Sequence, residues 1–376
     1  MKTKEKIKSK KVNILKIVLI VVVAIIMIAI AFVNLTTLPK YDNDKNVIYV
    51  GSMVKSHSVN YSDESGKGII KNPMVKIMQM VWRFCDSGDK KKHAKQKPPK
   101  NIEIIKDINY LDDNNLYHTL DIMYPENIGK NEKLPMIIDI HGGGWMYATK
   151  DLNENYCRSL CDRGYVVFNI SYRLVPDVNV NEQIKDVMSA LKWISENIKD
   201  YPCDSDNIML TGDSAGGMLS AYATVLLQSG ELRNVFNTVD AELNINTLVL
   251  TSPVAIMKSA GLFSLYTKPL WGKDYKNSET YNYMDFDEIL PYAKNMPPTY
   301  LITSSGDTLA QKQTLRLYEL LDKNGVECEL ANYGEEYGKS LAHVFSVLEP
   351  FDKAGKDAID GALNFFEENM KNKVNS

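Results

Sequence analysis

The chain has 376 residues, of which 44% are hydrophobic and 24% are charged, so we expect most of it to fold around a buried core. Its net charge of −3 gives no sign of nucleic-acid binding. That charge divides into +6 over residues 1–16, which hold seven Lys and one Glu, and −9 over the remainder. Five cysteines without a Cys-x-x-Cys pair argue against a disulfide framework and a cysteine-rich zinc site, although a single disulfide stays open.

Residues 17–33 are apolar without interruption and predict a helix that spans a membrane. At about 1.5 Å per residue this helix is about 25 Å long, slightly short of a hydrocarbon core of about 30 Å. Lys16 can reach the surface at one end, and residues 34–35 lengthen the other. No face of the stretch is polar, which argues against an ordinary core helix.

The lysine-rich flank predicts how this helix is oriented, because positively charged flanks stay in the cytoplasm. We therefore expect a basic cytoplasmic tail at residues 1–16, a transmembrane anchor at 17–35 and the rest of the chain outside. The alternative is a secreted protein whose signal peptide is cleaved near Ala31, since residues 29–31 have a small-x-small pattern. The apolar part of a signal peptide runs to about 7–15 residues, so the length of this stretch favours the anchor.

Residues 36–100 are interpreted as a cap and linker region before the main fold. Residues 74–84 place apolar side chains near one helical face and predict a helix that docks on the main fold as part of a lid. An ordinary packing helix without a role in substrate binding is the alternative. The lysine-rich run that follows ends at Pro98-Pro99 and is interpreted as a solvated linker.

From residue 101 to about 370, short apolar runs alternate with helical patterns. Strands are predicted at residues 102–108, 119–123, 135–140, 165–171, 208–211, 247–250, 299–303 and 326–331. Helices are predicted at residues 155–163 and 183–198 and from Ala215. This alternation is typical of an α/β domain with a mostly parallel central sheet and helices on both faces. The aromatic-rich stretch at about 256–290 interrupts it and predicts an insertion above the sheet.

The strand at 208–211 runs into Gly212-Asp213-Ser214-Ala215-Gly216, a Gly-x-Ser-x-Gly motif at the start of a helix. This strand–turn–helix arrangement is a nucleophile elbow, in which glycines permit the sharp turn and the serine hydroxyl is exposed at the carboxyl end of the sheet. We therefore predict that Ser214 is a nucleophile. A glycine-rich loop without a chemical role is the alternative.

A second glycine motif, His141-Gly142-Gly143-Gly144-Trp145, follows the strand at 135–140. Three glycines let backbone N–H groups approach a substrate oxygen, as in the HGGG-type oxyanion loops of lipases and esterases. A phosphate-binding loop is the alternative, but neither Lys-Ser/Thr nor Gly-x-Gly-x-x-Gly is present there. His141 ends the strand, so we expect it to brace the loop by hydrogen bonding.

A serine triad on this kind of fold needs an acid and then a histidine, in that chain order. Asp307 follows the strand at 299–303 beside a turn glycine, and capping the next helix is its alternative role. His343 is the one histidine of five that lies after Asp307, so elimination makes it the predicted base. Should Asp307 not be the acid, Glu335 is the first substitute.

Three motifs, HGGGW at 141–145, SYRLVPD at 171–177 and GDSAGG at 212–217, resemble the hormone-sensitive-lipase-like branch of the α/β-hydrolases, the bacterial family IV esterases. The resemblance covers about residues 100–370. It implies an α/β-hydrolase fold with a helical cap, in which residues 101–370 form the hydrolase domain and about 256–290 the cap insertion. It also matches Tyr172-Arg173-Leu174 to a structural brace.

The resemblance further implies that the backbone N–H groups of Gly143, Gly144 and Ala215 form the oxyanion hole. Asp307 matches an Asp-x-Leu position in the family, although Thr308 stands where the family usually has Pro. His343 matches the family's histidine, which is likewise followed two residues later by Phe.

These patterns predict a serine carboxylic-ester hydrolase that acts on short- to medium-chain acyl esters. We expect a small-molecule ester substrate, contact with a membrane through residues 17–33, no nucleic-acid partner and no metal or organic cofactor. The alternatives are a carbohydrate deacetylase on the same fold and a catalytically silent surface scaffold. A prolyl-oligopeptidase-like peptidase has a similar elbow but would not need the HGGG loop.

Bulky side chains in the two cap segments suggest a limit on acyl length. If they converge over Ser214, they fill volume that a long chain requires, and the preferred acyl group has about two to six carbons. If they pack outward, the pocket stays open. The residues concerned are Met74, Met78, Trp82, Phe84, Phe263, Tyr266, Trp271, Tyr275, Tyr281 and Tyr283.

Overall fold

The computed structural model describes residues 2–36, 40–41, 47–48, 73–113, 115–129, 131–175, 178–258, 270–272 and 275–370. Several residues named above lie outside the described residues. They are Pro176 and Asp177 of the SYRLVPD motif and Phe263 and Tyr266 of the expected insertion.

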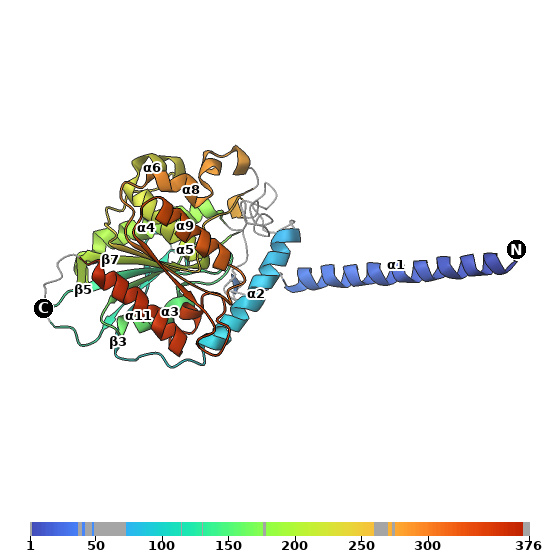
Figure 1. The fold of residues 1–376 in the computed structure, drawn as a ribbon, viewed down its shortest axis with the longest axis horizontal. Helices are drawn as coiled ribbons and strands as arrows, with labels where there is room; N and C mark the ends of the chain where they lie inside the picture. Colours follow the sequence, from blue (N-terminus) through green and yellow to red (C-terminus); the bar gives the residue numbers. More distant parts are fainter. Residues whose placement is uncertain are drawn as a thin grey trace.

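A mixed sheet of eight strands forms the centre of the molecule (Figure 1). Its strands are β3 (Ile102–Asn109), β4 (Thr119–Pro125), β5 (Leu134–Ile140), β6 (Val166–Ile170), β7 (Cys203–Asp213), β8 (Thr247–Thr251), β9 (Thr299–Ser304) and β10 (Cys328–Tyr333). Their order is β10-β9-β8-β7-β5-β6-β4-β3. β4 pairs antiparallel with both β3 and β6, and the other neighbours are parallel. All eight predicted strands and the mostly parallel sheet are confirmed.

Helices cover both faces of the sheet because strand side chains alternate between two apolar faces. Ile137 of β5 packs with α3 (Lys150–Cys161) and α11 (Lys353–Glu368) on one face. Its neighbour Ile138 faces the other core, with α4 (Val180–Asn197), α5 (Ser214–Gln228), α6 (Gly230–Phe236) and α9 (Gln311–Lys323). The two helical layers lie above and below the sheet in Figure 1.

Several predicted boundaries were wrong: α2 (Pro73–His93) continues into the lysine-rich run that was interpreted as a linker, and α3 and β7 begin early. α3 begins at Lys150, five residues before the predicted start, because the side chain of Thr149 caps it by accepting from the N–H of Asp151. β7 begins at Cys203 rather than at residue 208, because its first residues pair with the start of β5. Both contacts depend on neighbours that the periodicity of one segment does not reveal.

Short elements follow the sixth and eighth strands of the sheet. After β8 come η3 (Tyr275–Asn277), η4 (Glu279–Tyr283), α8 (Phe286–Ile289) and η5 (Leu290–Tyr292), which lie above the helices of one face (Figure 1). The short helix α10 (Phe345–Leu348) follows β10, and η1 (Ile198–Asp200) follows α4. Two short strands before the main fold, β1 (Lys40–Tyr41) and β2 (Val47–Ile48), pair antiparallel.

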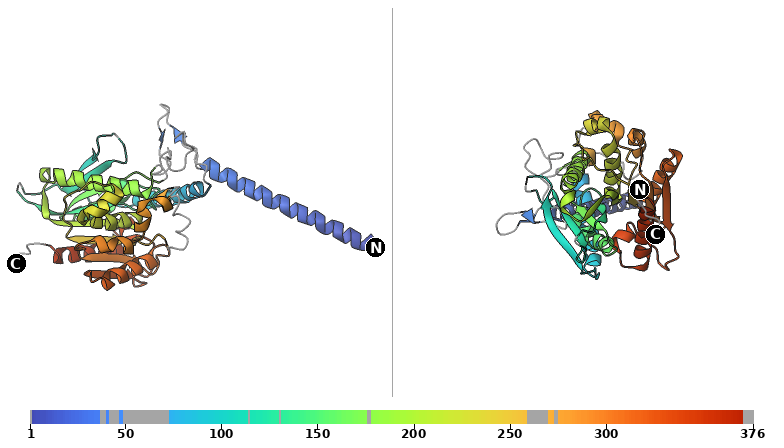
Figure 2. Two further views of the ribbon diagram at one scale, coloured as in Figure 1. Left: turned by 90° about the horizontal axis from the view of Figure 1, so that it is seen from above. Right: turned by 90° about the vertical axis from the view of Figure 1, so that its left-hand side faces the viewer.

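The N-terminal helix α1 (Lys2–Thr36) is a single helix of 35 residues that extends away from the body (Figures 1 and 2). Its segment Ile14–Phe32 has a mean hydropathy of 3.3 and exposed side chains, and it is long and apolar enough to cross a membrane. A signal sequence near an N-terminus meets the same criteria. The helix α2 (Pro73–His93) lies on the flank of the body from which α1 leaves.

Candidate active site

Ser214 lies on a sharp turn between β7 and α5, at the carboxyl end of the sheet. Its φ of 51° is in the left-handed region, which is strained for a residue with a side chain. A Cβ on Gly216 would lie 2.0 Å from the carbonyl oxygen of Ile140, and a Cβ on Gly212 would lie 2.4 Å from the hydroxyl of Ser220. Only glycine fits these two positions, so the motif forms the predicted elbow for a packing reason.

The structure brings Ser214, His343 and Asp307 together from three distant segments. His343 Nε2 lies 2.9 Å from Ser214 Oγ, and His343 Nδ1 lies 3.0 Å from Asp307 Oδ2. Asp307 follows β9, and His343 lies between β10 and α10. The three side chains therefore form one continuous line of hydrogen bonds, with the imidazole in the middle.

The loops that carry the acid and the histidine are packed directly on each other. A Cβ on Gly306 would lie 2.3 Å from the carbonyl oxygen of Leu341, so only glycine permits this approach. The hydroxyl of Ser304 donates to the same carbonyl at 2.8 Å. These contacts set the distance between Asp307 and His343, and the sequence analysis did not identify them.

The two carboxylate oxygens of Asp307 have different partners, and Asp307 does not cap α9, whose N-cap residue is Ala310. Oδ2 faces His343, while Oδ1 accepts from the N–H groups of Leu309 and Ala310 at 3.0 and 2.9 Å. Burial raises the pKa of this carboxyl, but the hydrogen bond and charge of His343 and the N–H of Ala310 outweigh burial and hold the pKa below its ordinary value. The side chain is therefore a carboxylate at neutral pH.

The HGGG loop places its last two glycines in conformations that other residues avoid. Gly143 and Gly144 have φ values of 105° and 56°, and a Cβ on Gly143 would lie 2.1 Å from the carbonyl oxygen of Tyr147. The N–H of Gly142 donates to Asp213 Oδ1 at 2.9 Å. Among the described residues, none accepts a backbone hydrogen bond from the N–H of Gly143, Gly144 or Ala215, so these three groups are available to a ligand.

Beneath this loop lies a buried carboxyl pair that the sequence analysis missed. Asn153 of α3 donates to both Asp139 and Asp213, each at 2.9 Å. Burial and the charge of Asp213 raise the pKa of Asp139 to about 8, and burial raises the pKa of Asp213 to about 6. Asp139 interrupts an otherwise apolar strand, which was the available signal.

His141 and the Tyr172-Arg173-Leu174 segment brace the loop, as predicted. The ring of Tyr172 stacks on that of His141 with centroids 4.4 Å apart, and its hydroxyl donates to the His141 carbonyl at 2.7 Å. Arg173 donates to both carboxylate oxygens of Asp186. Burial lowers the pKa of His141 to about 4, so this histidine is neutral and does not titrate near neutral pH.

The bulky cap residues do not all point toward Ser214. Trp82 of α2 stacks on Tyr147 with centroids 5.4 Å apart, and its ring would lie 2.6 Å from a Cβ on Gly144. Phe84, two residues further, is 63% exposed and points away from the body. Tyr283 packs on Phe236. The condition of full convergence over Ser214 is therefore wrong for Phe84 and Tyr283, whereas Trp82 lies against Gly144 of the HGGG loop.

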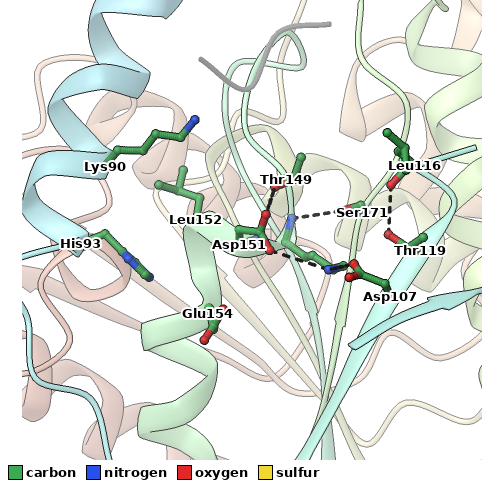
Figure 3. Close-up of a pocket in the computed structure, with 11 residues that line it drawn as sticks. Lys90, His93, Asp107, Leu116, Thr119, Thr149, Asp151, Leu152, Glu154 and Ser171 are labelled. Atoms are coloured by element: carbon green, nitrogen blue, oxygen red, sulfur yellow. Dashed lines mark hydrogen bonds and ion pairs between the residues drawn. The ribbon is translucent and has the colours of Figure 1, made fainter. Parts of the chain in front are cut away.

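A cavity of about 590 Å³ beside α2 is distinct from the triad (Figure 3). Its walls come from α2, the start of α3 and the adjacent strand ends, and its buried Lys150 donates to Asp107 at 2.7 Å and pairs with Asp121 at 2.8 Å. The triad residues do not line it. Within the described ranges, no three His, Cys, Asp or Glu side chains are grouped as a metal site requires.

The carboxyl pair predicts how stability depends on pH. Asp residues in the unfolded chain titrate near about 3.9, so above that pH the native state keeps protons that the unfolded state has lost. Stability therefore falls as pH rises, by up to about 1.4 kcal/mol per pH unit for each carboxyl. The loss of stability that Asp213 causes is complete near pH 6, whereas the loss that Asp139 causes continues to about pH 8.

We expect Asp139→Asn to remove the loss of stability between pH 6 and 8, because an amide keeps the shape of the carboxyl and has no proton to lose. Urea unfolding at pH 6, 7 and 8 measures this. The matched control is Asp112→Asn, at an exposed turn, which should follow the wild-type profile. An Asp139→Asn profile parallel to that of the wild type would contradict the assigned protonation.

Comparison with known proteins places this geometry in a family. A family model described as BD-FAE matches residues 120–320, which is more than half of the chain. The structure of esterase B from Lactobacillus rhamnosis superimposes with a TM-score of 0.74 and 29% identity, covering 82% of this chain and 96% of that one. The similarity therefore extends beyond the motifs to the whole hydrolase fold.

Curated relatives match over shorter segments. Neutral cholesterol ester hydrolase 1 of Pongo abelii is 33% identical over 141 residues, 32% of this chain and 35% of the relative. Carboxylesterase NlhH of Mycobacterium tuberculosis is 34% identical over 96 residues, 25% of this chain and 30% of the relative. The matches thus span about a third of these relatives' length. With the BD-FAE match and the esterase B structure, they show that the chain belongs to the hormone-sensitive-lipase-like esterases of the α/β-hydrolase superfamily.

Proposed function

We propose that the protein is a membrane-anchored serine carboxylesterase in which Ser214 is the nucleophile, His343 the general base and Asp307 the acid that orients the imidazole. The observation that carries this proposal is the hydrogen-bonded line from Ser214 Oγ through His343 to Asp307, at 2.9 and 3.0 Å. Family membership supports an ester as the substrate. The ionised state of Asp307 supports the tautomer that leaves His343 Nε2 facing the serine hydroxyl.

The geometry supports acyl transfer through a covalent intermediate. His343 Nε2 takes the proton of Ser214 as the hydroxyl oxygen attacks the ester carbonyl, and the imidazolium then protonates the departing alcohol. The N–H groups of Gly143, Gly144 and Ala215 stabilise the negative oxygen of the tetrahedral intermediate, each contributing about 3–4 kcal/mol by typical mutagenesis. Water, activated by the same histidine, releases the acyl group. Every proton in this cycle passes between His343 and Ser214, the departing alcohol or water.

We further propose a preference for short- to medium-chain acyl groups. Esterase B from Lactobacillus rhamnosis has been solved inhibited with a C4-C4 tributyrin phosphonate and in a C6-C4 inhibited form, which supports short acyl groups on this fold. In the present chain the ring of Trp82 lies against Gly144 and occupies space next to the oxyanion loop. Each buried methylene of an acyl chain contributes about 0.8 kcal/mol. Methylenes that extend beyond this ring are less buried and therefore contribute less.

The location that we propose is a single-pass anchor through residues 17–33 with the hydrolase domain outside. The length and hydropathy of Ile14–Phe32 support a span. The lysines of residues 2–16 support retention of the preceding segment in the cytoplasm.

Ser214→Ala should abolish ester hydrolysis, by a factor on the order of 10⁴ or more, because no other group supplies the attacking oxygen. It should also abolish covalent labelling by a fluorophosphonate probe while leaving thermal unfolding unchanged. The matched control is Ser195→Ala on α4, whose hydroxyl donates to the Lys192 carbonyl away from the triad. Wild-type protein that is folded yet neither hydrolyses esters nor labels at Ser214 would leave the silent scaffold as the better description.

A panel of p-nitrophenyl esters from acetyl to palmitoyl should show kcat/KM highest at about two to six acyl carbons, because a limited pocket stops rewarding added methylenes. Acetylated sugars belong in the same panel. A rise in kcat/KM through to palmitoyl would indicate an open pocket. Higher kcat/KM for acetylated sugars than for every simple ester would indicate the deacetylase.

The full-length protein should fractionate with membranes and resist extraction by high salt or alkaline carbonate, because transfer of the apolar segment Ile14–Phe32 into lipid is not reversed by charge screening. External protease on intact cells should cut within residues 90–100. Mature protein in the medium beginning at Phe32 would instead establish cleavage after Ala31.

A further inference from the structure

The helix α2 carries large apolar side chains on two different faces of its first three turns. At about 100° per residue, Ile77, Val81 and Phe84 lie within about 60° of one another. Met78 and Trp82 lie roughly a third of a turn away, on the face that packs on the body. A surface helix normally has one apolar face and one polar face, so the second apolar face of α2 requires a separate explanation.

The outer face is exposed in this structure. Ile77, Val81 and Phe84 are 42%, 42% and 63% exposed, whereas Met78 on the inner face is 2% exposed. Further along the same outer face lie Gly88 and Lys91, both exposed. The last turn of the helix contains Lys90, Lys91 and Lys92. Lys90 pairs with Asp86 and Lys92 with Glu349. The outer face is thus apolar over its first half and ends in one lysine, Lys91.

This combination is typical of a helix that lies in the surface of a bilayer, with apolar side chains among the acyl chains and lysines at the head groups. The position of α2 favours the same partner. It lies on the flank of the body from which α1 leaves (Figures 1 and 2). If α1 crosses a bilayer, α2 therefore lies on the side of the body that is nearest to that bilayer.

We propose that the outer face of α2, formed by Ile77, Val81, Phe84 and Lys91, docks on the lipid surface and presents the triad to esters held in the bilayer. This rests on the proposed function, since it adds a surface and a substrate location to the same site. The inner face of α2 reaches the catalytic machinery directly. Trp82 lies against Gly144, and Asp89 accepts a hydrogen bond from the hydroxyl of Tyr147 at 3.0 Å. One helix therefore contacts both the lipid and the oxyanion loop.

Quenching of tryptophan fluorescence by brominated lipid tests the docking independently of enzymatic activity. Full-length protein carrying Phe84→Trp is reconstituted in phosphatidylcholine–phosphatidylglycerol vesicles, with and without bromine near the carbonyl end of the acyl chains. The fluorescence added by the new tryptophan should fall by about half in the brominated vesicles, because an interfacial helix buries its apolar face by about 5–10 Å. The matched control is Val239→Trp, at a position that is 40% exposed beyond α6, which should show no quenching.

Three results would overturn the proposal. If the fluorescence of the tryptophan at position 84 is quenched by iodide but not by brominated lipid, the outer face lies in water. If protection of this tryptophan from iodide increases with the number of protein molecules per vesicle, without quenching by bromine, a second copy of the chain covers the face. Protection that is independent of density, again without bromine quenching, assigns the cover to another segment of the same chain.

The consequence for catalysis is tested separately. The variant with Ile77→Ser, Val81→Ser and Phe84→Ser should hydrolyse a bilayer-resident glyceride with one butyryl ester about tenfold more slowly, a factor equal to about 1.4 kcal/mol. Its turnover of water-soluble p-nitrophenyl acetate should be unchanged, as should that of Val239→Ser on both substrates. Equal loss on both substrates would indicate damage to the site rather than loss of docking. Wild-type protein inactive on p-nitrophenyl acetate would refute the proposed function and leave the quenching result to stand by itself.

Discussion

The close approach of the β5 loop to the turn after β7 is the contact on which the whole site depends. A Cβ on Gly216 would lie 2.0 Å from the Ile140 carbonyl oxygen, so only glycine permits the loop and the turn to approach this closely. The Gly142 N–H then binds Asp213, which adjoins Ser214. The proposed nucleophile and the proposed oxyanion donors are therefore parts of one interlocked surface. A shift of either strand would move both, which explains why Asn153 and the buried carboxyl pair hold the loops from below.

Most of the fold and the grouping of Ser214, Asp307 and His343 were predictable from sequence because their signals are local. An apolar run such as residues 135–140 predicts a buried strand by itself, and Gly-x-Ser-x-Gly needs only a strand before it and a helix after it. His343 followed from counting histidines. By contrast, the start of β7 at Cys203 depends on its partner strand, and the link between Asp139 and Asp213 spans strands whose adjacency no short pattern specifies. Long-range pairing is the information that periodicity lacks.

The directions in which the side chains of the cap segments point were likewise not predictable from the sequence. Trp82 and Phe84 are two residues apart on α2, and a list of bulky residues treats them alike. A helix turns by about 100° per residue, so the two rings point to opposite sides. Trp82 meets Gly144, whereas Phe84 remains exposed. Their different roles depend on which face of α2 packs on the body, and that depends on the surface beneath it, which includes Gly144 and Tyr147.

An apolar face on each side of α2 has a cost, because exposed apolar area is unfavourable in water by about 25 cal/mol per Å². Isolated exposed apolar residues are common, but three aligned on one helix face next to a membrane-length helix form a patch. If the patch were covered by the body, Trp82 would have to leave Gly144, because the helix cannot rotate one face inward without moving the other outward. The packing of Trp82 against Gly144 thus fixes the outer face of α2, and the same rotation leaves Phe84 exposed on the opposite side of the helix.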